Sequence, residues 1–168
     1  MYTIGYQGTS IERLIETLAD ANVSVLVDTR ESPMSRRPEF RAKALEATLG
    51  KAGIRYLSMR ALGAPKALRT MASNDWEGFA DGYREKLQLV REELESLVPI
   101  VASERVCLLC FEPDPHACHR SLLAQEIQGL LDVVAIHLRP GRSHEPDDHE
   151  GQRVLGDVAN DQVQIAFG

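Results

Sequence analysis

Two short, continuously apolar segments place the tightest constraint on the fold of this chain. VSVLVD (residues 23–28) and VCLLCF (residues 106–111) show no alternation of apolar and polar residues. Strands of this kind are buried on both faces, as in a parallel sheet that is covered by helices. Both runs end abruptly in polar residues, and the carboxyl ends of parallel strands are where α/β proteins bind ligands.

The rest of the pattern alternates strands with amphipathic helices. Strands are also predicted at 2–6, 54–58 and 132–138, and helices at 11–21, 39–52, 76–97 and after Asp114 and Pro115. Strands that alternate with helices imply right-handed crossovers. We therefore expect an α/β fold, a three-layer Rossmann-like sandwich with a mostly parallel five-stranded sheet and helices on both faces.

Local signals predict where some of these elements begin and end. Thr9 and Glu12 match a capping box for the first helix, and Asn22 is suited to a left-handed stop. The third helix should end before Pro99, because proline cannot continue the hydrogen-bond ladder. Residues 60–74 lack a clean period and are expected to form a long functional or lid-like loop, in which a helical turn is an open alternative.

The chain of 168 residues suits one domain. We predict a single α/β domain over residues 1–139, followed by a polar tail, 140–168, with a weak terminal element. No basic and apolar leader is visible, and no stretch reaches the roughly 18 apolar residues of a membrane span. A cytoplasmic protein without a membrane partner is expected, in which three cysteines favour reduced thiols, metal binding or catalysis over a disulfide framework.

Charge is distributed unevenly along the chain. The net charge is −6, yet residues 30–69 hold ten Lys and Arg against three Asp and Glu. A local basic surface on an acidic protein is typical of a protein that binds a small anionic ligand, a nucleotide or a nucleic acid. A solvated basic face without a partner is the alternative.

The segment DTRESPMSRRPEF (residues 28–40) is the first candidate binding loop. Its arginines could bind phosphate or carboxylate through forked hydrogen bonds. In the alternative interpretation, Asp28 pairs with Arg30 to hold the loop and the other arginines lie in solvent. The substrate-binding residues predicted here and nearby are Tyr6, Asp28, Arg30, Ser35, Arg36, Arg37 and Arg120.

The segment CFEPDPHACHR (residues 110–120) is the candidate chemical centre. The predicted catalytic residues are Cys110, Glu112, Cys118 and His119, at the end of one strand and the start of the next helix. The positive end of that helix would favour a thiolate on Cys118.

Three kinds of chemistry, besides a purely structural role, are open to this segment. A cysteine or Glu112 could act with His119 as a proton carrier. Cys110, Cys118 and His119 could bind zinc, although the segment lacks a CxxC motif. Cys110 and Cys118 could also form a redox pair, whereas Cys107 in mid-strand is expected in the core.

Four ordered motifs, TIGYQG, DTRESPMSRRPEF, LGAPKALR and CFEPDPHACHR, resemble the bacterial and archaeal family called domain of unknown function 488. The resemblance spans most of residues 1–138. It implies a Rossmann-like fold and matches the segment from Asp28 to Arg36 to the family's DxRxxPxS motif. Gly63 matches the first glycine of an LGG-like motif that is LGA in this chain.

These observations favour an enzyme that acts on a phosphate-bearing substrate, a nucleotide or nucleic acid, at the carboxyl ends of the strands. The alternatives are a non-catalytic module that binds a nucleotide or a partner, and a metal or thiol-redox site. The sequence identifies no cofactor, and no metal ligand is assigned among the site residues.

Overall fold

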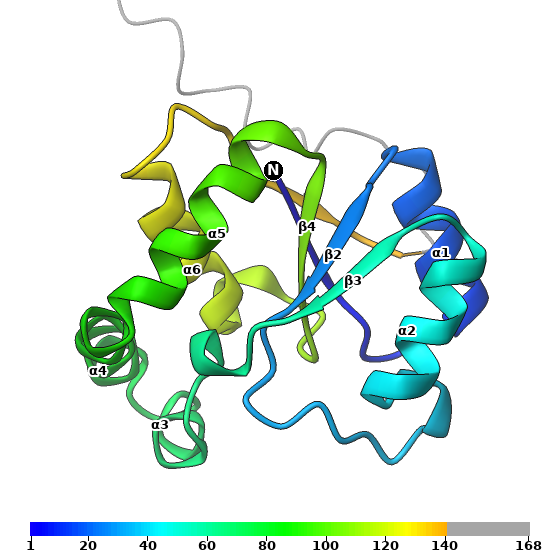
Figure 1. Ribbon diagram of the computed structural model, residues 1–168. Coiled ribbons are helices and arrows are strands. Elements are labelled where there is room, and N and C mark those ends of the chain that lie inside the picture. Colours follow the sequence, from blue (N-terminus) through cyan, green and yellow to red (C-terminus); the bar gives the residue numbers. More distant parts are fainter. Residues whose placement is uncertain (141–168) are drawn as a thin grey trace, which may run out of the picture.

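The computed structural model describes residues 1–140, in which five strands form one parallel sheet (Figure 1). The strands are β1 (Tyr2–Gly5), β2 (Val25–Asp28), β3 (Arg55–Ser58), β4 (Val106–Cys110) and β5 (Ile136–Leu138). They lie in the order β3-β2-β4-β1-β5, and every pair of neighbours is parallel. The predicted fold class is confirmed, whereas the predicted tail falls, apart from residue 140, outside the described residues.

Helices cover both faces of the sheet (Figure 1). The α-helices are α1 (Ile11–Asp20), α2 (Ala42–Lys51), α3 (Lys66–Met71), α4 (Trp76–Leu89), α5 (Arg91–Ser103) and α6 (His119–Gln128). Short 3-10 helices are η1 (Pro38–Phe40), η2 (Arg60–Leu62) and η3 (Pro115–Ala117). Within residues 1–140, no helix is long and apolar enough to cross a bilayer.

Two apolar cores lie on opposite faces of the sheet because side chains alternate along each strand. Val106 and Leu108 of β4 pack with the inner sides of α4, α5 and α6. Cys107 and Leu109 of the same strand pack with α1 and α2. The uninterrupted apolar run of β4 is therefore explained, since both of its faces are covered.

Several predicted boundaries move by a few residues. The first helix is capped by Ser10, whose Oγ accepts a hydrogen bond from the Arg13 amide at 3.2 Å, rather than by Thr9. Asn22 does adopt the left-handed conformation, with φ of 52°. Asp114 caps η3, and α6 begins only after Cys118.

The long helix predicted over residues 76–97 is two helices, broken at Val90, and the predicted stop before Pro99 is wrong. Pro99 lies inside α5, which continues to Ser103. Burial of Leu97 and Val101 on the same side of α5 offsets the lost backbone hydrogen bond. The loop predicted at 60–74 contains η2 and the six-residue α3, which is more helix than the single turn that the sequence left open.

Candidate functional site

The topology places a cleft beyond the carboxyl ends of β1 and β4. The chain leaves β1 towards α1 on one face of the sheet and leaves neighbouring β4 towards α6 on the other. Ligands bind in α/β sheets at such a point of reversal. A cleft of about 540 Å3 opens here, lined by Tyr6, Gln7, Gly8, Arg30, Ser32, Met34, Ser35, Arg36, Arg37, Arg69, Cys110, Phe111, Glu112 and His119.

The four predicted catalytic residues meet at the floor of the cleft, where Cys110, Glu112 and His119 line the cleft and Cys118 lies directly behind them. The Glu112 Oε2 atom accepts from the Cys110 thiol at 2.9 Å and from the Cys118 thiol at 3.3 Å. The Nδ1 atom of His119 lies 3.6 Å from the Cys110 sulfur and 3.9 Å from the Cys118 sulfur. Two soft sulfurs, an imidazole and a carboxylate therefore share one small volume.

The ring of His119 is held by backbone and aromatic contacts. Its Nε2 atom lies 3.1 Å from the Thr29 carbonyl oxygen, while the Thr29 hydroxyl donates its hydrogen to the Leu109 carbonyl at 2.9 Å. Because the carbonyl can only accept, this network assigns the imidazole hydrogen to Nε2. Tyr83 packs edge-on against the ring at 5.3 Å. In the neutral imidazole, the Nδ1 lone pair then faces the two sulfurs.

Burial favours the protonated thiol form of Cys118 over the thiolate. Burial raises the pKa of Cys118 well above its ordinary value, and the adjacent Cys110 raises it further, against a smaller opposing effect of His119. The expected thiolate at the helix start is thus not what this environment favours. Burial would also raise the pKa of Glu112, but hydrogen bonds from Cys110, its own backbone and Cys118 outweigh it, so this pKa is lowered.

Asp28 and Arg30 form the buried ion pair of the alternative interpretation, and of the two only Arg30 lines the cleft, so the predicted contact of Asp28 with a substrate does not fit its position. Asp28 Oδ1 accepts from Arg30 Nε at 2.8 Å, and its Oδ2 accepts from Arg30 Nη2 at 2.5 Å and from the Tyr56 hydroxyl at 2.6 Å. Arg30 Nη1 donates to the Tyr6 hydroxyl at 3.0 Å and to the Phe40 carbonyl at 2.9 Å. These bonds use four of the five guanidinium hydrogens, so one Nη2 hydrogen remains for a ligand.

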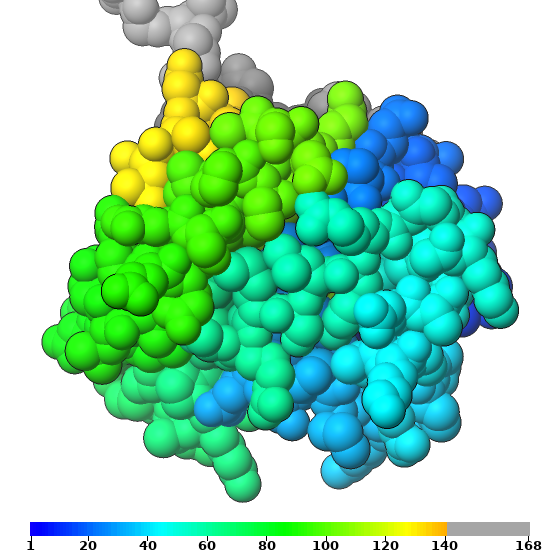
Figure 2. All heavy atoms as spheres, viewed as in Figure 1, coloured from blue at the N-terminus to red at the C-terminus, as the bar shows by residue number. Residues whose placement is uncertain are grey.

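The other arginines of the cleft are closer to solvent. Arg36 is exposed and has no hydrogen bond or ion pair with the rest of residues 1–140. Arg69 of α3 makes only a long 3.6 Å ion pair with Glu31. Arg37 is more constrained, because it pairs with Glu39 at 2.8 Å and donates to the Thr9 carbonyl. The segment after β2 and the α3 region lie along the same edge of the molecule (Figure 2).

Arg120 lies elsewhere than predicted. Its side chain is buried, and it donates to the carbonyl oxygens of Glu112 at 2.5 Å and Pro113 at 3.0 Å. Its Nε also donates to the Thr3 hydroxyl at 3.3 Å. Arg120 therefore does not line the cleft. It holds the loop that carries Glu112, and the predicted role in substrate binding does not fit this position.

Apolar side chains complete the cleft. The Tyr6 ring stacks on Phe40 at 4.4 Å and meets the edge of Phe111 at 5.3 Å. Phe111 is 44% exposed and Met34 is 73% exposed. A large apolar surface beside the unpaired Arg36 and the weakly paired Arg69 suits a ligand that has both a planar apolar part and an anionic part.

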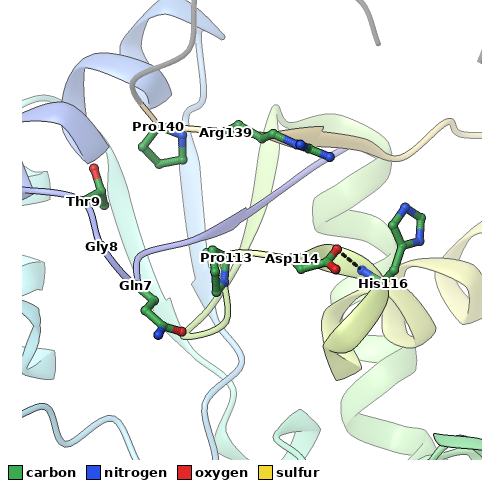
Figure 3. A pocket seen from close by; sticks show the side chains of 9 residues that line it. Gln7, Gly8, Thr9, Pro113, Asp114, His116, Arg139 and Pro140 are labelled. Carbon is green, nitrogen blue, oxygen red and sulfur yellow. Dashed lines mark hydrogen bonds between the residues drawn. The ribbon is translucent and has the colours of Figure 1, made fainter. Parts of the chain in front are cut away.

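A second hollow adjoins the loop after β1 (Figure 3) and shares Gln7 and Gly8 with the cleft. It is lined by Gly5, Gln7, Gly8, Thr9, Pro113, Asp114, His116, Arg139 and Pro140. Asp114 accepts from the His116 amide at 2.9 Å, which closes the turn of η3. None of the four clustered residues of the cleft lines this hollow.

Sequence reasoning missed several contributors to the cleft. Thr29 acts through its carbonyl oxygen, which no side-chain pattern reports. Tyr83 lies in the segment predicted as a helix over residues 76–97 and is buried in the core, but its ring also touches His119. Arg69 lay in a segment predicted as loop. Its inclusion in the basic block of residues 30–69 was the available signal.

Comparison with known proteins identifies the family. The model of the domain of unknown function DUF488 matches residues 10–127, which is more than half of the chain. The chain belongs to this family, as its four motifs indicated. Searches among curated proteins and among solved structures gave no match. The function of the cleft must therefore be argued from its own chemistry.

Proposed function

We propose that this protein is an enzyme that acts on a phosphate-bearing substrate of the nucleotide class, bound in the cleft beyond β1 and β4. One observation carries the proposal. A single cleft presents the guanidinium of Arg36, which no other described residue pairs, together with the weakly paired Arg69, an exposed aromatic ring and a cluster of reactive groups. Convergence of this kind is the usual mark of an active site.

The anionic part of the substrate would lie against Arg36 and Arg69. Arg36 has its guanidinium free of other described residues, and Arg69 gives up only a long, solvent-exposed ion pair on binding. Neither group needs to break a buried interaction. Arginine binds phosphate with paired, charge-assisted hydrogen bonds. The remaining Nη2 hydrogen of Arg30 supplies a third donor from the buried side of the cleft.

The base of a nucleotide would pack against Phe111. This ring is braced from the side by Tyr6, while almost half of its surface is open. Stacking of a nucleic-acid base on an aromatic side chain contributes about 1–3 kcal/mol and tolerates any base. The arrangement therefore distinguishes a nucleotide from inorganic phosphate.

The reacting end of the substrate would face Cys110, Glu112 and His119. These three residues line the cleft, whereas Cys118 lies behind them. Glu112 is placed to accept a proton because its Oε2 already accepts from both thiols. A base positioned in this way accelerates reactions by about 100-fold to 10,000-fold.

Binding should be tested by calorimetric titration with AMP, GMP, CMP, UMP and inorganic phosphate. We expect Arg36→Ala to weaken the affinity for every ligand about 10-fold or more, because the variant loses a charged hydrogen bond worth about 1.5–3 kcal/mol. Phe111→Ala should weaken the binding of the mononucleotides and leave the binding of inorganic phosphate unchanged. Arg84→Ala is the matched control, since Arg84 is also exposed but pairs with Asp81 on α4 and does not line the cleft.

Turnover of each bound mononucleotide should then be followed by phosphorus and proton NMR, with and without added divalent cations. Glu112→Gln should bind as the wild type does and lose turnover. Absence of binding, or equal effects of Arg36→Ala and Arg84→Ala, would refute the nucleotide site. If the wild type binds nucleotides without turnover, the protein is a nucleotide-binding module and not an enzyme. We also propose a cytoplasmic location, which suits the free state of Cys107, Cys110 and Cys118.

A further inference from the structure

Three donor atoms on the cleft floor have the spacing of a metal site. The two sulfurs of Cys110 and Cys118 and a ring nitrogen of His119 all lie within 4.8 Å of one another. In a tetrahedral zinc site, metal–ligand distances of about 2.3 Å to sulfur and 2.1 Å to nitrogen place a sulfur and a nitrogen about 3.6 Å apart and two sulfurs about 3.8 Å apart. The observed distances from His119 Nδ1 to the sulfurs are 3.6 and 3.9 Å.

The orientation of His119 favours coordination independently of these distances. Metal-bound histidines usually donate their other ring N–H to a carbonyl or carboxylate, which fixes the ring and its tautomer. Here Nε2 lies 3.1 Å from the Thr29 carbonyl oxygen. The outer partner of a ligating histidine is thus already in place, and the Nδ1 lone pair faces the sulfurs.

The closest hydrogen bonds of this cluster run to Glu112, and His119 Nδ1 makes only the longer contacts to the two sulfurs. One imidazole nitrogen faces two sulfurs, and the carboxylate of Glu112 is the close acceptor for both thiols. All three donor residues are at least 95% buried, so there is little room for water to solvate them. A cation that binds the two sulfurs and the His119 nitrogen would give a partner to each of these three atoms.

We infer that Cys110, Cys118 and His119 bind one divalent cation of borderline-soft character, with Zn2+ as the best match. Sulfur and imidazole ligands together favour zinc over the hard cations Mg2+ and Ca2+. The site stands on its own geometry and does not depend on nucleotide binding in the cleft.

Three protein ligands and an open fourth position distinguish catalytic zinc sites from structural ones. Cys110 and His119 line the cleft, as does Glu112, while Cys118 holds the site from behind. Such an ion lowers the pKa of bound water and polarises phosphoryl oxygens. Glu112 is near enough either to complete the coordination or to take a proton from a water at the fourth position.

Loading the site from two neutral thiols is balanced by proton release. Each thiol loses its S–H hydrogen as a sulfur–metal bond forms, so one Zn2+ displaces two protons to solvent. Because both sulfur ligands must be deprotonated, affinity should rise with pH. No change of oxidation state is involved.

The test is titration of the reduced, chelator-treated full-length chain with Zn2+ and Co2+. We expect one ion per chain by elemental analysis, and thiolate-to-cobalt charge-transfer absorption with Co2+. Cys118→Ala and His119→Gln should each weaken Zn2+ binding by more than roughly 10–100-fold, which is the usual loss when a residue that only hydrogen-bonds a metal ligand is removed. Cys107→Ala is the matched control, because this third buried thiol lies on the opposite face of β4.

Several outcomes would overturn the inference. These are no stoichiometric Zn2+ or Co2+ in the wild type, a cobalt spectrum without thiolate bands, or equal weakening by Cys107→Ala. A Cys110–Cys118 disulfide that resists mild reduction, seen by mass spectrometry, would also overturn it. The wild-type cobalt spectrum needs no variant, so misfolding of Cys118→Ala leaves the inference testable. Metal binding without nucleotide binding would refute the proposed function alone.

Discussion

Removal of the Asp28 carboxylate should destabilise the protein strongly, because it leaves the buried guanidinium of Arg30 without its counterion. Asp28 is fully buried and Arg30 is 5% exposed. Breaking a buried ion pair by deleting one partner costs about 3–5 kcal/mol. With a urea m-value of about 2 kcal/mol/M, Asp28→Ala should lower the unfolding midpoint by about 1.5–2.5 M.

Urea unfolding followed by circular dichroism measures this loss. Glu104→Ala is the matched control, since its ion pair with Arg55 is at the surface, where such pairs contribute about 0–1 kcal/mol. The double variant Asp28→Ala/Arg30→Met should regain part of the loss, because it removes the stranded charge. The reasoning fails if Asp28→Ala is no more harmful than Glu104→Ala, or if the double variant regains nothing.

Three further predictions follow from neighbouring contacts. Tyr56→Phe removes a 2.6 Å hydrogen bond to Asp28 and should cost about 1.5–3 kcal/mol in urea unfolding. Burial, followed by the bond to Asp28, raises the pKa of Tyr56, so its contribution is complete below the unfolded pKa of about 10 and is lost at higher pH. Alkaline denaturation should therefore be less steep in Tyr56→Phe than in the wild type, and identical profiles would contradict this account. Gly5→Ala would drive a Cβ into the Glu112 carbonyl and should lower Tm and weaken nucleotide binding, whereas Gly50→Ala, which lies in α2 and meets open space, should leave nucleotide binding unchanged and raise Tm slightly. Tyr83→Phe should cost about 1–3 kcal/mol through loss of the 2.6 Å bond to the Leu62 carbonyl, and an unchanged Tm would count against it.

The fold was predictable because the strongest sequence signals are also the main energetic ones. The apolar runs of β2 and β4 reflect burial on both faces, and that burial selects a parallel α/β sheet. Pro99 misled the prediction for the opposite reason. Proline by itself favours the end of a helix, but the packing of Leu97 and Val101 in the core outweighs this preference. A local sequence pattern does not report such packing.

The candidate site was predictable in residue content but not in the division of roles. Strand ends and a helix start indicated that Cys110, Glu112, Cys118 and His119 would meet, and the structure brings them together. The burial of Arg120 against loop carbonyls depends on three-dimensional packing, as does the orientation of His119 by a carbonyl. A sequence shows which side chains are available, whereas backbone acceptors appear only in the folded chain.

The most direct test of the proposed active site is a crystal structure of the zinc-loaded protein soaked with the mononucleotide that binds best. We predict phosphate density beside Arg36 and Arg69, a base against Phe111, and the reacting end within reach of Glu112 on the cleft floor. A nucleotide bound elsewhere, or a cleft that stays empty at saturating concentration, would contradict the account.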